Sequence, residues 1–179
     1  MGTYNYTHIM EYLPTRYSAT PEQRSERQAV WNFKDGYCSS SIKQQIKEKI
    51  LLIKKTFSFG NCRVCFIPAS SHLKTIRRYS ELCRYIEKET GCVCSIDTIS
   101  SVHDTEAGHI YGKQRNPAEN FCFDRNEIQG KNIILIDDVI TRGNTFVCTA
   151  DKLIENGASN VVGLFVAKTI NPDRAYHCA

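Results

Sequence analysis

The period of the apolar positions changes near residue 60. Before that point, residues 20–34 and 39–57 place apolar side chains every three to four positions, which indicates two helices with one buried face each. Thr20 and Gln23 have the spacing of a capping box at the start of the first helix. We expect residues 1–60 to be helical and to contain no strand.

Beyond residue 60, short apolar runs alternate with helical patterns. The expected strands are residues 63–68, 92–99, 120–124, 132–136 and 160–167, and the expected helices are residues 75–89 and 144–156. Such alternation is typical of a parallel sheet covered on both faces. The predicted fold class is α/β, a doubly wound, mostly parallel sheet over residues 61–179, with a small helical N-terminal hood over residues 1–60.

Composition limits the size of the core, the possible partners and the expected location of the protein. With 179 residues, 41% of them hydrophobic, the chain can bury one sizeable core. The net charge of +4 is spread along the chain without a run of lysines or arginines, which does not favour nucleic acid as a partner but does not exclude it. The N-terminus lacks a secretory pattern, and there is no apolar run of 18 residues, so we expect a cytoplasmic protein with no membrane partner.

Nine cysteines are scattered along the chain, and their number is odd, which favours reduced thiols over a disulfide framework. Cys62 and Cys65 form a CxxC pair, for which metal binding or redox chemistry is the alternative. Side chains alternate along a strand, so the two thiols should point to opposite faces of the sheet. We therefore interpret them as core residues.

Residues 133–145 carry the clearest chemical signal, because a buried apolar run meets two acids, Asp137 and Asp138, and then a turn containing Gly143. Ligands of open α/β sheets bind beyond the carboxyl ends of the strands, so these carboxylates should face a pocket, where ribose hydroxyls suit them. The turn at residues 141–145 can direct N–H groups, threonine hydroxyls and a helix N-terminus at one phosphate. An isolated Asp-Asp pair would more often cap a turn, but the whole run indicates a sugar phosphate site.

This run resembles the phosphoribosyl pyrophosphate signature of the type I phosphoribosyltransferases. The resemblance implies the fold of that family and a catalytic role for Asp137 and Asp138, which would bind the ribose 2- and 3-hydroxyls and reach a metal mainly through water. The residues that would wrap the 5-phosphate are Thr141, Arg142, Gly143, Asn144 and Thr145.

The same resemblance implies the reaction. The ribose 5-phosphate of phosphoribosyl pyrophosphate would pass to a small nitrogen acceptor, a nucleobase or an amine, and pyrophosphate would leave with Mg²⁺ bound to it. Hypoxanthine-guanine relatives carry an aspartate where this chain has Thr141, which argues against a close purine-salvage relative. Dimers are usual in the family, and the sequence leaves the oligomeric state open.

Three further segments correspond to parts of the family's site. Ala69, Ser70 and Ser71 lie where the family holds pyrophosphate with backbone N–H groups, although an ordinary strand-to-helix connection would look similar. Lys168 lies where purine-using relatives place a lysine against the base carbonyl, and a solvated lysine at a strand end is the alternative.

Residues 100–117 correspond to the loop that closes over the site in the family. A closing loop needs a cation to meet the departing pyrophosphate, and Lys113 or Arg115 would supply it. We expect the two histidines of this stretch, His103 and His109, to be solvated.

Residues 31–36, Trp-Asn-Phe-Lys-Asp-Gly, resemble an aromatic-Lys-Gly segment that precedes the core in the ComF-like branch of the family. The chain lacks that branch's N-terminal zinc-binding cysteine pairs, and residues 77–81 read Arg-Arg-Tyr-Ser-Glu instead of Arg-Gly-Phe-Asn-Gln. Members of the branch are associated with DNA uptake, so the alternative function is a non-catalytic accessory protein that binds a phosphoribosyl ligand or DNA. The candidate DNA-binding patch consists of Lys74, Arg77, Arg78 and Arg84.

Overall fold

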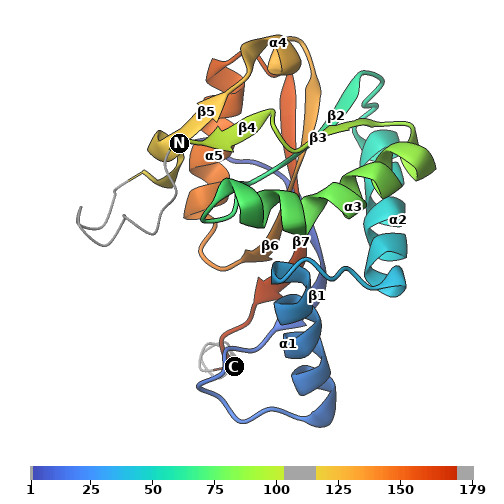
Figure 1. The fold of residues 1–179 in the computed structure, drawn as a ribbon, viewed down its shortest axis with the longest axis vertical. Helices are drawn as coiled ribbons and strands as arrows, with labels where there is room; N and C mark the ends of the chain where they lie inside the picture. Colours follow the sequence, from blue (N-terminus) through green and yellow to red (C-terminus); the bar gives the residue numbers. More distant parts are fainter. Residues whose placement is uncertain (1, 103–115, 173–179) are drawn as a thin grey trace.

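The computed structural model describes residues 2–102 and 116–172 and is built around one sheet (Figure 1). All neighbouring strands of this sheet are parallel. In spatial order the five strands are β1 (Tyr6–Tyr12), β7 (Asn160–Thr169), β6 (Asn132–Ile140), β2 (Cys62–Phe66) and β3 (Val93–Ser95).

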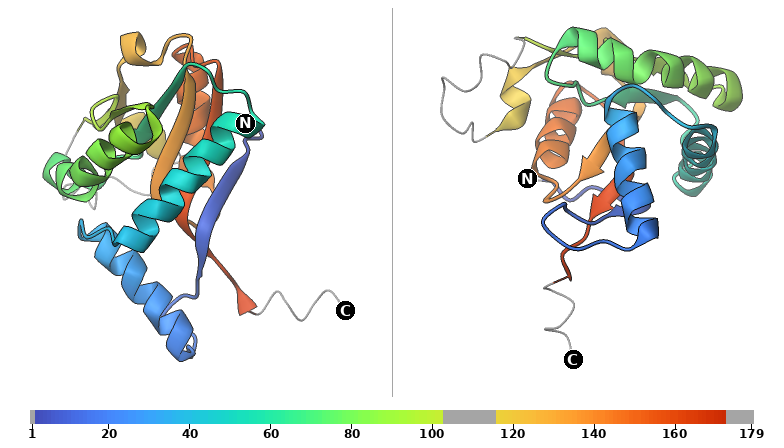
Figure 2. Two further views of the ribbon diagram at one scale, coloured as in Figure 1. Left: turned by 90° about the vertical axis from the view of Figure 1, so that its right-hand side faces the viewer. Right: turned by 60° about the horizontal axis from the view of Figure 1, so that its bottom comes forward.

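Helices cover both faces of this sheet (Figure 2). The α-helices of the described residues are α1 (Pro21–Lys34), α2 (Ser40–Thr56), α3 (His72–Thr90), α4 (Arg125–Ile128) and α5 (Asn144–Glu155). A short 3₁₀ turn, η2 (Pro117–Asn120), precedes an antiparallel pair formed by β4 (Ile99–Ser101) and β5 (Phe121–Phe123). Helices α1, α2 and α3 pack on one face, and α4, α5 and the β4–β5 pair pack on the other. The expected doubly wound α/β class is confirmed.

Residues 133–136 form a continuous apolar run because this part of β6 is buried on both faces of the sheet. Ile134 and Ile136 belong to the core beneath α2 and α3, whereas Ile133 and Leu135 belong to the core beneath α5. All four side chains are fully buried. Burying one such side chain contributes about 1.5–3 kcal/mol, so a strand buried on both faces stabilises both layers.

The helices begin where the sequence places their caps. The Thr20 hydroxyl accepts a hydrogen bond from the Gln23 backbone N–H at 3.3 Å, and the Thr20 N–H donates to the Gln23 side chain at 3.0 Å. The predicted capping box is confirmed. The Ser39 hydroxyl caps α2 by accepting a hydrogen bond from the Ile42 N–H at 3.3 Å, and the buried side chains of α2 are Ile42, Ile46, Ile50 and Ile53.

The expectation of a strandless N-terminal segment is wrong, because residues 6–12 form β1. This strand pairs in parallel with β7, with Tyr6 opposite Gly163 and Tyr12 opposite Thr169. Its tyrosine, threonine and isoleucine residues favour extended backbone, and pairing with β7 satisfies their N–H and C=O groups. The N-terminal segment thus contributes an edge strand to the sheet as well as α1 and α2.

Two other strand predictions need correction. The single strand expected over residues 92–99 is two strands, β3 and β4, because the Ser95 hydroxyl accepts hydrogen bonds from the Asp97 and Thr98 N–H groups and turns the chain between them. Strand β6 continues through the two acids to Ile140 instead of ending before them. Its ladder with β7 extends that far and keeps the backbone extended.

The cysteines of the described residues are free thiols. Cys62 and Cys65 belong to the cores on opposite faces of the sheet, as the alternation of a strand predicts. None of the described helices combines the length and the apolar character needed to cross a bilayer.

We expect Gly163→Ala to lower the free energy of unfolding by about 1–3 kcal/mol, because overpacking strains a core. A Cβ atom at this position would lie 2.7 Å from the Phe165 ring and 2.8 Å from the Phe146 ring. Urea denaturation would measure the change. Gly60→Ala is the matched control, since no atom of the described residues lies within 4 Å of a Cβ there. Equal stability of the two variants would contradict the prediction.

Candidate active site

The strand order reverses direction between β2 and β6. From β2 the chain moves outward to β3, and from β6 it moves in the opposite direction to β7. Such a topological switch point is where open α/β sheets bind their ligands, beyond the carboxyl ends of the strands. The loops that follow β2 and β6, residues 67–71 and 141–143, therefore flank the expected binding region.

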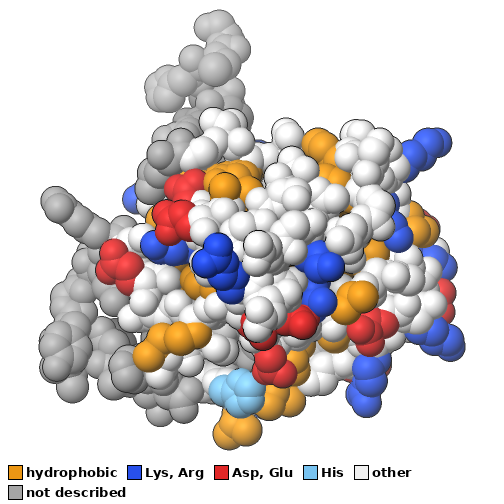
Figure 3. Space-filling model, turned by 90° about the horizontal axis from the view of Figure 1, so that it is seen from above, with side chains coloured by type: hydrophobic (Ala, Val, Ile, Leu, Met, Phe, Trp, Pro, Cys, Tyr) orange, Lys and Arg blue, Asp and Glu red, His pale blue; other side chains and the backbone are white. Residues whose placement is uncertain are grey.

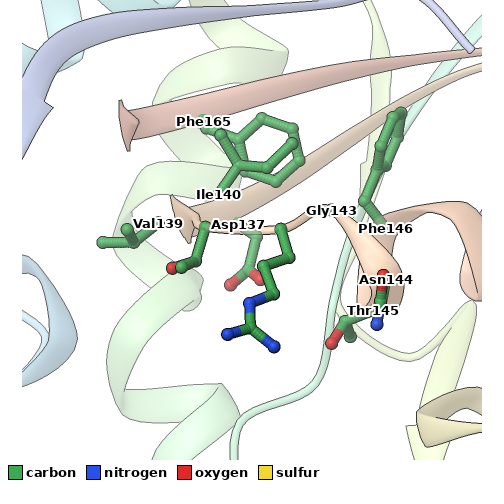
Figure 4. Close-up of a pocket in the computed structure, with 10 residues that line it drawn as sticks. Asp137, Val139, Ile140, Gly143, Asn144, Thr145, Phe146 and Phe165 are labelled. Carbon is green, nitrogen blue, oxygen red and sulfur yellow. The ribbon is translucent and has the colours of Figure 1, made fainter. Parts of the chain in front are cut away.

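A cavity of about 270 Å³ opens where β6 meets α5. Figure 4 shows Asp137 and Thr145 pointing to one side of the loop between these elements, with the rings of Phe146 and Phe165 on the other side. The cavity is lined by Asp137, Val139, Ile140, Thr141, Arg142, Gly143, Asn144, Thr145, Phe146 and Phe165. The structure thus brings together six of the residues that the signature singled out.

Asp137 is held by hydrogen bonds from two directions. Its Oδ1 accepts one from the Tyr79 hydroxyl at 3.3 Å and one from the Asp138 backbone N–H at 2.8 Å. Burial, followed by repulsion from the Asp138 carboxylate, raises the pKa of Asp137 from 3.8 to about 7. Near neutral pH this group is therefore partly protonated, and it can donate a hydrogen bond as well as accept one.

Asp138 is paired with two cations instead. Arg78 Nη1 lies 2.7 Å from Asp138 Oδ2, and Lys34 Nζ lies 3.8 Å from Asp138 Oδ1. The side chains of Asp138 and Arg78 are each only 13% exposed, whereas that of Lys34 is 45% exposed. The Asp138 carboxylate is thus paired with cations where water is largely excluded.

The start of α5 is arranged to receive an anion. Gly143 precedes the helix with φ +78°, a conformation that favours glycine, and no side chain caps this end of the helix. The first-turn N–H groups of a helix lack intrahelical partners, and Asn144 and Thr145 of this turn line the cavity, where the helix dipole adds positive character. Residues 141–145, predicted to wrap a phosphate, do form this turn.

The segment after β2 differs in part from the prediction. The Ala69 N–H already donates to the Thr75 hydroxyl at 3.0 Å, so this group is occupied within the protein. The Ser71 hydroxyl caps α3 by accepting from the Lys74 N–H at 3.3 Å. The Ser70 hydroxyl accepts from Lys74 Nζ at 3.2 Å, which holds that lysine at the loop.

Lys168 lies within β7, not after it, and lines a second cavity of about 450 Å³. Arg16 also lines this cavity, and Thr141 and Arg142 line both cavities. The two spaces are therefore neighbours across the loop that follows β6. The other predicted cations, Lys113 and Arg115, lie outside the described residues, as do His103 and His109.

Sequence reasoning missed two residues of the site and misjudged a third. Tyr79 and Lys34 contact the acidic pair, and Arg78, which we placed in the candidate DNA-binding patch, is largely buried against it. A sequence signal existed for all three, because residues 77–81 and 31–36 occupy places where the ComF-like branch has distinctive segments. Their contact with Asp137 and Asp138 depends on how α1 and α3 pack on the sheet.

The comparisons with known proteins give partial similarities, and no family model matches the chain. The DNA utilization protein YhgH of Salmonella typhi is 27% identical over 114 residues, which are 60% of this chain and 50% of that protein. The adenine phosphoribosyltransferase of Corynebacterium kroppenstedtii is 54% identical over 39 residues, 22% of this chain and 21% of the enzyme. Among solved structures, a hypoxanthine-guanine phosphoribosyltransferase of Bacillus anthracis has a TM-score of 0.47 at 21% identity, covering 74% of this chain and 68% of that one. The chain spans about half the length of YhgH.

We expect the raised pKa of Asp137 to appear in the stability of the protein. The folded state binds this proton more tightly than the unfolded chain, so the stabilisation is complete below about pH 4 and is lost as the pH rises through about 7. Asp137→Asn keeps a side-chain oxygen that can accept the hydrogen bond from Tyr79, but its amide group does not ionise. The variant should therefore be more stable than the wild type at pH 8, by about 1 kcal/mol or more.

Urea denaturation between pH 4 and 8 would measure both stability profiles. Asp97→Asn, at an exposed position, is the control and should keep the wild-type slope. Parallel profiles for the wild type and Asp137→Asn would contradict the assignment.

Proposed function

We propose that the chain is a phosphoribosyltransferase of type I fold, which transfers ribose 5-phosphate from phosphoribosyl pyrophosphate to a nitrogen acceptor and releases pyrophosphate. One observation carries the proposal: the acidic pair and the uncapped, glycine-initiated end of α5 flank the topological switch point of the sheet. The resemblance of residues 133–145 to the family signature and the short match to an adenine phosphoribosyltransferase point the same way. A cytoplasmic location, expected from the sequence, belongs to the same proposal.

The protein offers suitable binding groups to both the 5-phosphate and the ribose of phosphoribosyl pyrophosphate. The turn at residues 141–145 offers N–H groups and hydroxyls to the 5-phosphate, and Asp137 lines the same cavity. Asp138, the next residue along β6, does not line it, and in the proposal both carboxylates accept the ribose hydroxyls. As pyrophosphate leaves C1, positive charge develops on the ribose ring, and nearby carboxylates stabilise it. Because the pKa of Asp137 is raised to about 7, the site carries more negative charge above that pH than below it.

A magnesium ion fits this donor set as a companion of the substrate. The described residues hold no group of three or more His, Cys, Asp or Glu side chains that could bind a metal on their own. Two carboxylates match an ion that keeps waters and binds substrate oxygens, and Asp137 and Asp138 are the residues that would hold it, mainly through water. When bound, magnesium would neutralise negative charge on the pyrophosphate.

The neighbouring cavity of about 450 Å³ is where we place the acceptor. Among the described residues, its lining contributes the cations Arg16, Arg142 and Lys168 and no carboxylate. Such a lining favours an acceptor that carries carbonyl oxygens or negative charge beside its reactive nitrogen. Thr141 lines both cavities, and its hydroxyl is paired with that of Thr169 at 3.0 Å, so no general base stands at this position.

The alternative, a DNA-uptake accessory role, has the partial likeness to YhgH in its favour. Its candidate basic patch is weakened by the structure, because Arg78 is turned inward and paired with Asp138. On the face shown in Figure 3, lysine and arginine side chains stand apart, with acidic side chains between them. DNA binding needs clustered cations, so the phosphoribosyl site is the stronger basis for function.

Calorimetric titration of phosphoribosyl pyrophosphate with magnesium tests the proposal. The wild type should bind, and the double variant Asp137→Asn with Asp138→Asn should lose at least about tenfold in affinity, because each charge-assisted hydrogen bond contributes about 1.5–3 kcal/mol. Asp97→Asn, which removes an exposed carboxylate elsewhere, should bind like the wild type. If the folded wild type bound no donor, the accessory role would become the better hypothesis.

A separate experiment addresses the accessory role. The triple variant Lys74→Glu, Arg77→Glu and Arg84→Glu reverses the exposed part of the candidate patch and leaves Arg78 in place. We expect its affinity for DNA, and the salt dependence of that affinity, to equal those of the wild type in fluorescence anisotropy. A weaker affinity with a salt slope reduced by about one unit per lost contact would support DNA binding instead.

A further inference from the structure

Residues 31–36, at the end of α1, dock against α3 beside the acidic pair. Arg78 Nε donates a hydrogen bond to the Lys34 carbonyl oxygen at 3.1 Å. One residue earlier, the Phe33 ring packs edge-on against the Tyr79 ring with their centroids 6.1 Å apart, and both rings are fully buried. Since Arg78 and Tyr79 also hold Asp138 and Asp137, the same two residues position the end of α1 and the acidic pair.

Gly36 is required for this docking. Its φ of +91° favours glycine, and a Cβ atom there would lie 2.5 Å from the Arg77 carbonyl oxygen. No larger residue allows the chain to pass so close to α3. The backbone after α1 is thereby fixed. This positions Lys34 beside Asp138, although the two residues are more than 100 positions apart in the sequence.

The two cations at Asp138 differ in their freedom to move. Arg78 is held by Asp138 and by the Lys34 carbonyl oxygen, and it is largely buried. The Lys34 ammonium lies 3.8 Å from the carboxylate, beyond ordinary hydrogen-bond distance, and its side chain is 45% exposed. Lys34 is therefore the cation of this pair that can turn toward a ligand without breaking a buried contact.

We propose that Lys34 contacts the pyrophosphate group of the donor, an inference that rests on the proposed function. In the donor, pyrophosphate is bonded to C1, next to the carbon that carries the 2-hydroxyl. A ribose whose hydroxyls meet Asp137 and Asp138 thus brings its pyrophosphate within a few bonds of the carboxylate that Lys34 faces. The ammonium then exchanges one carboxylate for phosphate oxygens with a larger negative charge.

This contact has a consequence for the reaction. When the bond between C1 and oxygen breaks, the negative charge on the pyrophosphate increases, and a cation already beside it stabilises the leaving group. Lys34 would supply that charge from α1, independently of the loop after β4.

Three probes, each titrated calorimetrically in the presence of magnesium, separate this role from a structural one. They are phosphoribosyl pyrophosphate, inorganic pyrophosphate and ribose 5-phosphate, which lacks the pyrophosphate. We expect Lys34→Met to lower the affinity for phosphoribosyl pyrophosphate and for inorganic pyrophosphate by about tenfold. The affinity for ribose 5-phosphate should stay unchanged or increase, because Asp138 loses a competing partner. Lys34→Arg should keep the affinity for both pyrophosphate ligands within about threefold of the wild type.

Lys55→Met is the matched control, since it removes an exposed lysine at the end of α2 and should change none of the three affinities. Thermal unfolding of each variant verifies that it is folded. Equal weakening of all three ligands by Lys34→Met would assign Lys34 to holding Asp138, and unchanged binding of the pyrophosphate ligands would also overturn the proposal. Failure of the wild type to bind the donor or ribose 5-phosphate is a distinct result, which would overturn the proposed function and this inference with it.

Discussion

Two carboxylates stand side by side at the end of β6 where water is largely excluded, and their mutual repulsion has to be offset within the protein. Two charges 4 Å apart repel each other by about 4 kcal/mol at the effective dielectric constant near a protein surface. The protein offsets this in two different ways. Asp138 forms an ion pair with Arg78, while Asp137 accepts hydrogen bonds and has its pKa raised to about 7.

Helix α3 supplies both compensating groups from adjacent positions, Arg78 and Tyr79. The stacking of Tyr79 on Phe66 of β2, with ring centroids 4.3 Å apart, ties the same helix to the neighbouring strand. The orientation of α3 is thereby set by the acidic pair and by the core together. The start of α3, the loop that precedes it and the end of α1 then take their places relative to β6, so the acidic pair organises elements from both halves of the chain.

How much of this could be predicted from the sequence depended on the distance between partners. The turn at residues 141–145 and the helices α1 and α2 were predictable because their signals are contiguous or periodic. Strand β1 was missed because residues 6–12 are partly exposed at the sheet edge and show no clear alternation. Arg78 and Lys34 were not assigned to the site because Asp138 lies 60 positions beyond the first and further still from the second, and no local pattern encodes which helix packs over which strand end.

The acidic pair also bears on whether this site binds a ligand or has only a structural role. A carboxyl group whose pKa is raised by burial and by a like charge destabilises the folded protein near neutral pH, and apolar side chains at the end of β6 would avoid that cost. Strained electrostatics of this kind are characteristic of sites that act on ligands. Here Asp137 lies beside a helix start that no described side chain caps, so a carboxyl group suited to hydroxyls and a turn suited to a phosphate line the same cavity. One ligand that carries both groups accounts for the two features together, whereas a purely structural role accounts for neither.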